Sequence, residues 1–77
     1  MEEFLANSVG IAAKVIRLAI EHGLGVAQYP RAEPRWALVE SNKVVKSELY
    51  SNHNNDKVQA TIVAIMKALI ALKGSEG

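Results

Sequence analysis

The stretch that decides the fold is residues 35–50, RWALVESNKVVKSELY, in which apolar and polar side chains alternate on both sides of Ser41-Asn42. Alternation with a period of two is typical of a half-buried strand, and two such runs around a short turn predict a β-hairpin. A two-residue turn at Ser41-Asn42 sets the register of this hairpin. The register places opposite charges directly across from each other, which favours it over a one-residue slip; the two pairs are Arg35 with Glu48 and Glu40 with Lys43.

The register divides the side chains of the hairpin between two faces. We expect one face to be buried against helices, and it carries Trp36, Leu38, Val45 and Leu49. We expect the other face to be exposed, and it carries Arg35, Lys46 and Glu48. The sequence therefore predicts a sheet whose large apolar side chains face the core.

Before the hairpin, the chain has the pattern of a helix followed by another strand. Residues 2–22 place apolar side chains around most of a helix and leave a narrow polar stripe, made of Glu3, Asn7, Lys14, Arg17 and Glu21. Gly23 and Gly25 suit the end of that helix. Residues 24–29 have the character of a short strand, and Pro30 and Pro34 mark a loop before the hairpin.

After the hairpin, residues 51–56 are rich in turn-forming and helix-capping side chains. Asn54 or Asn55 is the predicted cap of a second helix that runs to about Lys73. The main apolar stripe of this helix is made of Val58, Ile62, Ile65, Leu69 and Leu72. A second edge has only small side chains, which we expect to allow close approach of the other helix: Ala60, Ala64, Ala68 and Ala71.

The order helix, strand, strand, strand, helix predicts one α+β domain. Three antiparallel strands expose an apolar face, and we expect the two helices to cover it side by side. A chain of 77 residues has room for a single small domain of marginal stability. We expect this domain to span residues 1–77, with a short flexible tail at residues 74–77.

Composition restricts the classes of function. The formal net charge is +1, so no strong overall field attracts nucleic acid or an anionic membrane. Cysteine is absent, which excludes disulfides, thiolate nucleophiles and cysteine-ligated metals. The first apolar run contains Lys14 and Arg17 and lacks the pattern of a secretory signal. We therefore expect a cytoplasmic protein.

No residue pattern in the sequence indicates catalysis, a cofactor or a metal. We interpret His22 and His53 as capping or surface histidines. Residues 54–56 lack the ligand series of a calcium loop, so a helix cap is expected there. The serines have no nucleophile motif, no glycine-rich phosphate loop is present, and the central glutamates fall on separate elements. We expect a protein that is not an enzyme.

The element order resembles that of the double-stranded RNA-binding domain family, whose members have a similar length. In that family the second helix opens with a cluster of lysines that contact phosphates. The corresponding segment here, NNDKVQA at residues 54–60, contains one lysine and places Asp56 before it. The resemblance implies the fold and, as the alternative function, a nucleic-acid-binding module. The basic side chains open to that function are Arg31, Arg35, Lys43, Lys46 and Lys57.

The favoured hypothesis is a small protein that binds another protein and forms a homodimer. The first helix is apolar over roughly two-thirds of its circumference, which exceeds what a surface helix buries on its own. An exposed apolar patch of that width is usually covered by a partner, most often a second copy of the chain. The outer edges of both helices supply the expected interface residues, Ile16, Val63 and Ile70. The size of the chain is similar to that of bacterial and phage accessory proteins, including inhibitors of host machinery.

Overall fold

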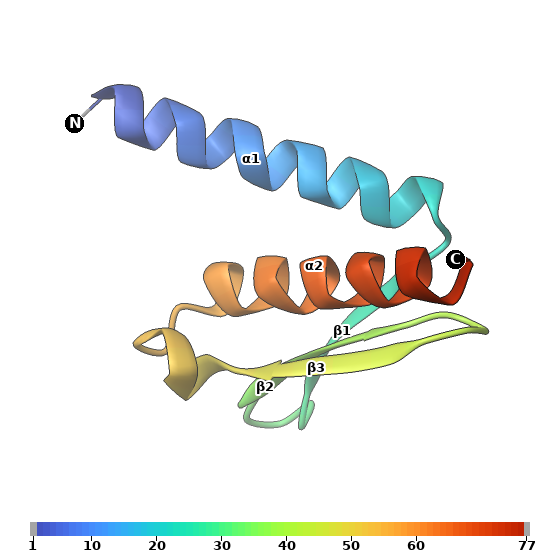
Figure 1. Cartoon of the computed structure of the whole chain (residues 1–77). Coiled ribbons are helices and arrows are strands. Elements are labelled where there is room, and N and C mark those ends of the chain that lie inside the picture. The colour runs from blue at the N-terminus through green and yellow to red at the C-terminus, as the bar shows by residue number, and fades with distance from the viewer. Residues whose placement is uncertain (1, 77) are drawn as a thin grey trace.

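The protein folds as two helices and a three-stranded sheet, in a computed structural model that describes the backbone of residues 2–76 and the side chains of residues 10–74. The sheet is antiparallel, with strand order β1-β2-β3, and both helices lie on the same side of it (Figure 1). The predicted α+β class and the order α-β-β-β-α are confirmed. The elements are α1 (Glu2–Glu21), β1 (Gly25–Tyr29), β2 (Trp36–Glu40), β3 (Val45–Leu49), the short 3-10 helix η1 (Tyr50–His53) and α2 (Lys57–Glu76).

The two helices form successive layers over the sheet. α2 packs directly on β2 and β3, and α1 lies on the outer side of α2, which is its main contact (Figure 1). Gly23 ends α1 with a φ of 69°, a left-handed conformation that glycine adopts without steric cost. The turn is closed by hydrogen bonds from Leu24 N to Ala19 O (2.8 Å) and from Gly23 N to Ile20 O (3.1 Å). This turn directs the chain from the outer layer into β1.

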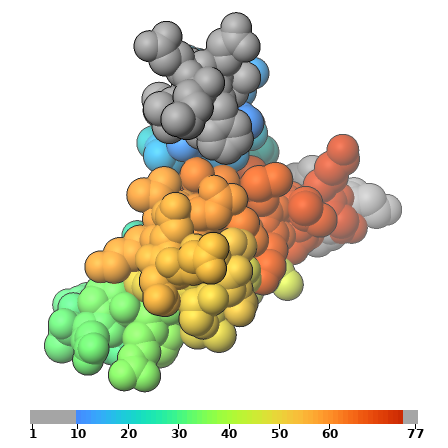
Figure 2. Space-filling view, turned by 90° about the vertical axis from the view of Figure 1, so that its left-hand side faces the viewer, coloured from blue at the N-terminus to red at the C-terminus, as the bar shows by residue number. Residues whose placement is uncertain are grey.

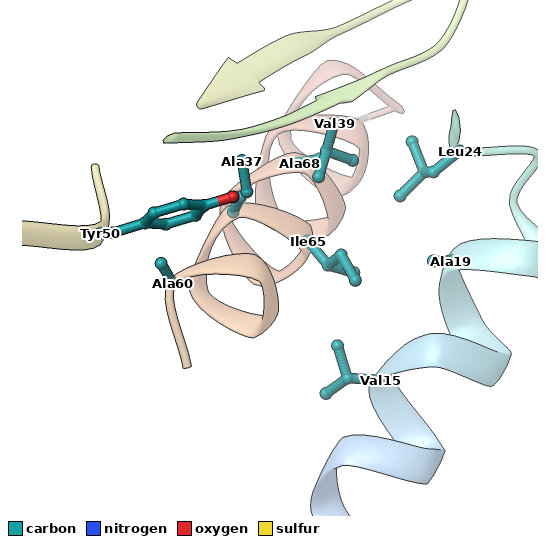
Figure 3. Close-up of a cluster of buried hydrophobic side chains, with 10 residues drawn as sticks. Val15, Ala19, Leu24, Ala37, Val39, Tyr50, Ala60, Ile65 and Ala68 are labelled. Atoms are coloured by element: carbon teal, nitrogen blue, oxygen red, sulfur yellow. The ribbon is translucent and has the colours of Figure 1, made fainter. Parts of the chain in front are cut away.

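Small side chains fill the space between α2 and the sheet. Ala37 and Val39 of β2 are fully buried in the same core as the alanines of α2 (Figure 3), which are Ala60, Ala64 and Ala68. Because neither surface carries a bulky side chain at this contact, the helix and the sheet can approach each other closely. The alanine edge of α2 therefore faces the sheet, and the expectation that it faces the other helix is wrong.

Larger side chains fill the space between the two helices. Val15 and Ala19 of α1 lie on the side of this core away from the sheet, where Val15 points toward Ile65 of α2, and Leu24 lies at the edge of the core between α1 and the sheet (Figure 3). Ile62, Leu69 and Leu72 of the predicted apolar stripe pack against the same core. In the polar stripe predicted for the first helix, Lys14, Arg17 and Glu21 are exposed, whereas the side chains of Glu3 and Asn7 lie outside the described residues.

The face of the hairpin that is buried is the one predicted to be exposed. Ala37, Val39 and Glu48 point toward α2, and Arg35 and Lys46 are exposed as expected. The expectation that Glu48 is exposed is therefore wrong. The cause lies in β2, where alternation places apolar side chains on both faces and the smaller ones fit under α2.

The large apolar side chains of the hairpin lie on the side of the sheet away from the helices, and the expectation that they pack against the helices is wrong. Val45 is 61% exposed on this side, Leu49 is also exposed, and Trp36 and Leu38 are half-buried. β1 contributes Ala27 and Tyr29 to the same side. We call this side the open face, defined by Ala27, Tyr29, Trp36, Leu38, Val45 and Leu49.

The register of the hairpin differs by two residues from the predicted one. Trp36 lies opposite Leu49, and Glu40 lies opposite Val45. Residues 41–44 form the connecting loop, in which Ser41 N donates to Val44 O (2.8 Å) and Lys43 N donates to Ser41 Oγ (3.2 Å). The predicted pairs Arg35–Glu48 and Glu40–Lys43 do not form. A two-residue shift keeps every side chain on its face, so the hydrophobic alternation does not distinguish the two registers.

The segment between β3 and α2 was predicted as a turn and contains η1. Asn54 and Asn55 follow it with positive φ angles of 55° and 62°, a conformation that asparagine tolerates better than most residues. Asp56 is the cap of α2, because its Oδ1 accepts a hydrogen bond from Gln59 N (3.0 Å). The predicted cap at Asn54 or Asn55 is therefore wrong by one or two residues. The helix also continues past the expected end at Lys73, to Glu76.

Candidate functional site

A flank of α1 exposes large apolar side chains to solvent. Ile16 is 50% exposed and Ile20 is 73% exposed, and they lie one turn apart on the same side of the helix. Val15 and Ala19, which point to α2, occupy a different side. Since α2 covers only one side of α1, the helix retains apolar surface that nothing in the described part of the chain covers.

An apolar groove adjoins this flank. Its volume is about 320 Å³, and Ile16 forms its wall on the side of α1. The first turns of α2 form the opposite wall through Val58, Ile62 and Ile65, and Pro34 closes one end. A groove of this volume lies at the lower limit for small-molecule sites and also fits large side chains from a partner protein.

The groove exists because α2 covers only part of the helix side of the sheet. α2 packs on β2 and β3, whereas β1 keeps Val26 43% exposed although this residue points to the same side as the buried Val39. The position over β1 is the one that a helix lying beside α2 would occupy. Here α1 lies on top of α2, so the expectation that the helices lie side by side on the sheet is wrong and this position stays open (Figure 1).

The base of the groove is polar and fully hydrogen-bonded. Tyr50 Oη donates to Gln28 Oε1, Gln28 Nε2 donates to Thr61 Oγ1 (3.2 Å), and Thr61 Oγ1 donates to Lys57 O (2.7 Å). No buried side-chain nitrogen or oxygen among the described residues lacks a hydrogen-bond partner. Because these side chains are already paired with one another, the base of the groove is not a set of free donors and acceptors, and Lys57 is the charged residue of the lining.

The predicted interface residues fall on two separate surfaces. Ile16 lines the groove on the side of β1. Val63 and Ile70 share a helix face with Lys67, whose ammonium group reaches Glu48 on β3, the opposite edge of the sheet. Ile70 is 69% exposed and Val63 is half-buried. The structure therefore does not bring the three residues together in one patch.

The predicted basic residues also separate into groups. One group is exposed at one end of the molecule, where the loop after β1, the residue before β2 and the start of α2 meet (Figure 2). It consists of Arg31, Arg35 and Lys57, in that order. Lys43 lies in the loop at the opposite end of the hairpin, and Lys46 is on the helix side of β3. The five residues do not form one continuous basic surface.

Glu48 is the centre of a charged cluster that the sequence pattern did not reveal. Its buried carboxylate accepts hydrogen bonds from Lys67 Nζ of α2 and from His53 Nε2 of η1, the latter at 2.6 Å. The hydrogen bond from Lys67, and then that from His53, hold the pKa of Glu48 below its ordinary value of 4.5. The interpretation of His53 as a capping or surface residue is wrong, because its side chain is largely buried against Glu48.

This cluster links three elements of the fold. Both oxygens of Glu48 are occupied, one by Lys67 and one by His53. The two partners are 5 and 19 residues away along the chain, so no local motif could have indicated the contact with Lys67. We interpret the cluster as a structural connection of β3 with η1 and α2.

The described residues hold no group of three or more His, Cys, Asp or Glu side chains arranged for a metal ion. None of the helices described is long and apolar enough to cross a membrane. Comparisons with protein-family models, curated proteins and solved structures gave no match. The function must therefore be inferred from the surfaces of the molecule.

Proposed function

We propose that the protein is a non-catalytic protein–protein interaction module that binds a second copy of itself. The surface that would carry the contact is the flank of α1 with Ile16 and Ile20, together with the groove beside it. The observation that supports this proposal is the exposure of these two isoleucines, 50% and 73%, next to an apolar groove of about 320 Å³. Removal of such apolar surface from water by a partner is favourable and stabilises the complex.

A second copy is the partner that this surface fits best. A twofold interface uses the same patch on both subunits, so the patch has to be complementary to itself. The flank and the groove can be complementary to themselves, because a projecting apolar helix side and an apolar groove lie next to each other. The flank carries one exposed pair of opposite charges next to Ile20, Arg17 with Glu21 (3.8 Å), and Lys57 adds a positive charge where it lines the groove. Two copies facing each other would present opposite charges around an apolar centre.

The test is sedimentation equilibrium of the whole chain over a hundredfold range of concentration around the micromolar level. We expect a dimer of the 8.4 kDa chain. Ile20→Lys should shift the equilibrium to the monomer, because a lysine there would have to lose its hydration in the interface. Ile70→Lys is the matched control, since it changes the same residue type at similar exposure on another surface.

Two outcomes would contradict the proposal. A mass of 8.4 kDa at every concentration would refute self-association. A dimer that Ile70→Lys disrupts and Ile20→Lys does not would place the contact on the outer edge of α2 instead of the groove. Circular dichroism of both variants establishes that they are folded, which is expected because both side chains are exposed.

A further inference from the structure

The open face of the sheet carries a row of large side chains at one end. Tyr29, Trp36 and Leu49 lie directly opposite one another on the three strands. The aromatic pair is half-buried, and Leu49 is exposed. Neighbouring aromatic rings on an open sheet form a surface on which flat, apolar rings of a ligand can stack.

Two arginines lie in the segment that joins β1 to β2, close in sequence to this row. Arg31 follows β1 by two positions, and Arg35 directly precedes Trp36. Both side chains are exposed, and neither takes part in an ion pair among the described residues. The backbone of Arg35 is held on both sides, because its N donates to Tyr29 O (2.7 Å) and its O accepts from Tyr50 N (2.9 Å). Arg35 lines, together with Leu49, the hollow at the end of the aromatic row.

A hollow continues the row toward η1. Its volume is about 360 Å³, and its lining includes Arg35, Leu49, Ser51 and Asn55. The loop after β1, η1 and the start of α2 surround this end of the molecule (Figure 2). A hydroxyl and an amide beside an apolar side chain provide a donor and acceptor set for the edge of a heteroaromatic ring.

We propose that this end of the open face binds short single-stranded nucleic acid. Tyr29 and Trp36 would stack on bases, Arg31 and Arg35 would contact phosphates, and the hollow would receive the edge of one base. The aromatic rings can stack on any base, and the arginines contact only the phosphate backbone. This site would therefore bind single strands with little sequence preference. The two arginines would attract an acidic peptide as well as a nucleic acid. The aromatic side chains favour the nucleic acid, because aspartate and glutamate have no ring that could stack on them.

The aromatic row is separate from the surface proposed for self-association, although the hollow shares Pro34 and Tyr50 with the lining of the groove. The open face and the groove lie on opposite sides of the sheet, since Tyr29 and Trp36 point away from α2 whereas Gln28 points toward it. The variant Ile20→Lys should therefore bind single strands as the unchanged chain does. Failure of one proposal leaves the other standing.

The experiment uses the only tryptophan of the chain, Trp36, as its reporter. The probes are octamers of thymidylate and of uridylate, which distinguish DNA from RNA, titrated with protein up to about 100 µM, the weak end of non-specific nucleic-acid binding. We expect saturable quenching of Trp36 fluorescence and a rise in anisotropy of the labelled octamer. Two phosphate contacts give a salt slope of about −1.4, so affinity should fall about sevenfold between 50 and 200 mM salt.

Variants separate the arginine contacts from general charge. Arg31→Ser with Arg35→Ser should weaken binding at least tenfold and flatten the salt slope, whereas Lys43→Ser, at the other end of the hairpin, should change neither. These side chains are exposed, so the variants keep the fold. The proposal is overturned by absence of quenching at the lowest salt, by equal effects of the arginine and lysine variants, or by equal binding of poly-glutamate. A duplex of the same length that binds as tightly as the single strand would also overturn it.

Discussion

The orientation of the sheet can be tested with the same substitution on its two faces. Val39 has no exposed surface, and it lies between β2 and the alanines of α2. Val39→Ala removes two carbon atoms, worth about 1.6 kcal/mol at about 0.8 kcal/mol for each buried carbon. The cavity adds to this, because neighbouring alanines have no side chain that could move into it, and the total is about 2–3 kcal/mol. Val45→Ala removes the same atoms from a side chain that is 61% exposed, and it should cost less than about 1 kcal/mol.

Urea unfolding at 25 °C, followed by far-ultraviolet circular dichroism, measures both free energies. A domain of this length has a stability of about 4–12 kcal/mol, so the loss at Val39 is a large fraction of the whole. With a slope of about 1 kcal/mol per molar urea, the midpoint should fall by about 2–3 M for Val39→Ala and by less than about 1 M for Val45→Ala. All samples need one protein concentration, because the proposed self-association would make stability depend on it.

Equal losses of stability in the two variants, or a larger loss for Val45→Ala, would contradict this orientation of the sheet. Either result would mean that the large apolar face of the hairpin contacts the helices, as the sequence pattern predicted. A change in the urea slope of one variant alone would show that its unfolded or native state differs in compactness. The comparison of midpoints is valid only when the slopes agree.

Two further tests concern the charged groups around α2. Because Lys67 and then His53 lower the pKa of Glu48 in the folded state below 4.5, the stability it contributes is present above about pH 4.5 and is lost as the pH falls through the lower folded-state value. Thermal melts between neutral and acid pH should show a steeper loss for the unchanged protein than for Glu48→Gln, and parallel curves would contradict this. Asp56→Ala removes the cap of α2 and should cost about 1 kcal/mol, which lowers Tm by about 4–8 °C. Asp56→Asn keeps an acceptor oxygen and should cost much less; equal decreases would show that the cap is elsewhere.

The order of the elements could be predicted because each has a strong local signal. Periodicity identified both helices, and alternation around Ser41-Asn42 identified the hairpin. The glycine at position 23 marked the end of α1, where it adopts positive φ. These signals depend on residues close together in the chain, and they do not depend on which surfaces meet in the fold.

The buried face of the sheet could not be predicted in the same way. Both faces of β2 are apolar, with Trp36 and Leu38 on one and Ala37 and Val39 on the other. The sequence prediction followed the larger side chains, whereas α2 packs on the smaller ones through its alanines. Complementary size across a contact is a property of two segments, and inspection of either segment alone does not reveal it.

The candidate site was predictable only in part. Exposure of Ile16 and Ile70 follows from helices that are apolar over more than one face. The groove does not follow from the pattern, because it depends on α1 lying over α2 and leaving β1 uncovered. The pairing of Glu48 with Lys67 likewise depends on the sheet facing α2 with its smaller side.

The outer position of α1 divides the molecule into an inner unit and an attached helix. The contacts of the sheet join neighbouring segments of the chain, whereas the α1–α2 contact brings residue 15 to residue 65. Contacts between distant positions require closure of a long loop, and the entropic cost of that closure slows their formation. α1 would then dock last and detach first. Its release would expose Val15 and Ile65 to water while the strands stay paired. Backbone amides of α1 should accordingly lose protection from hydrogen exchange well before those of β2.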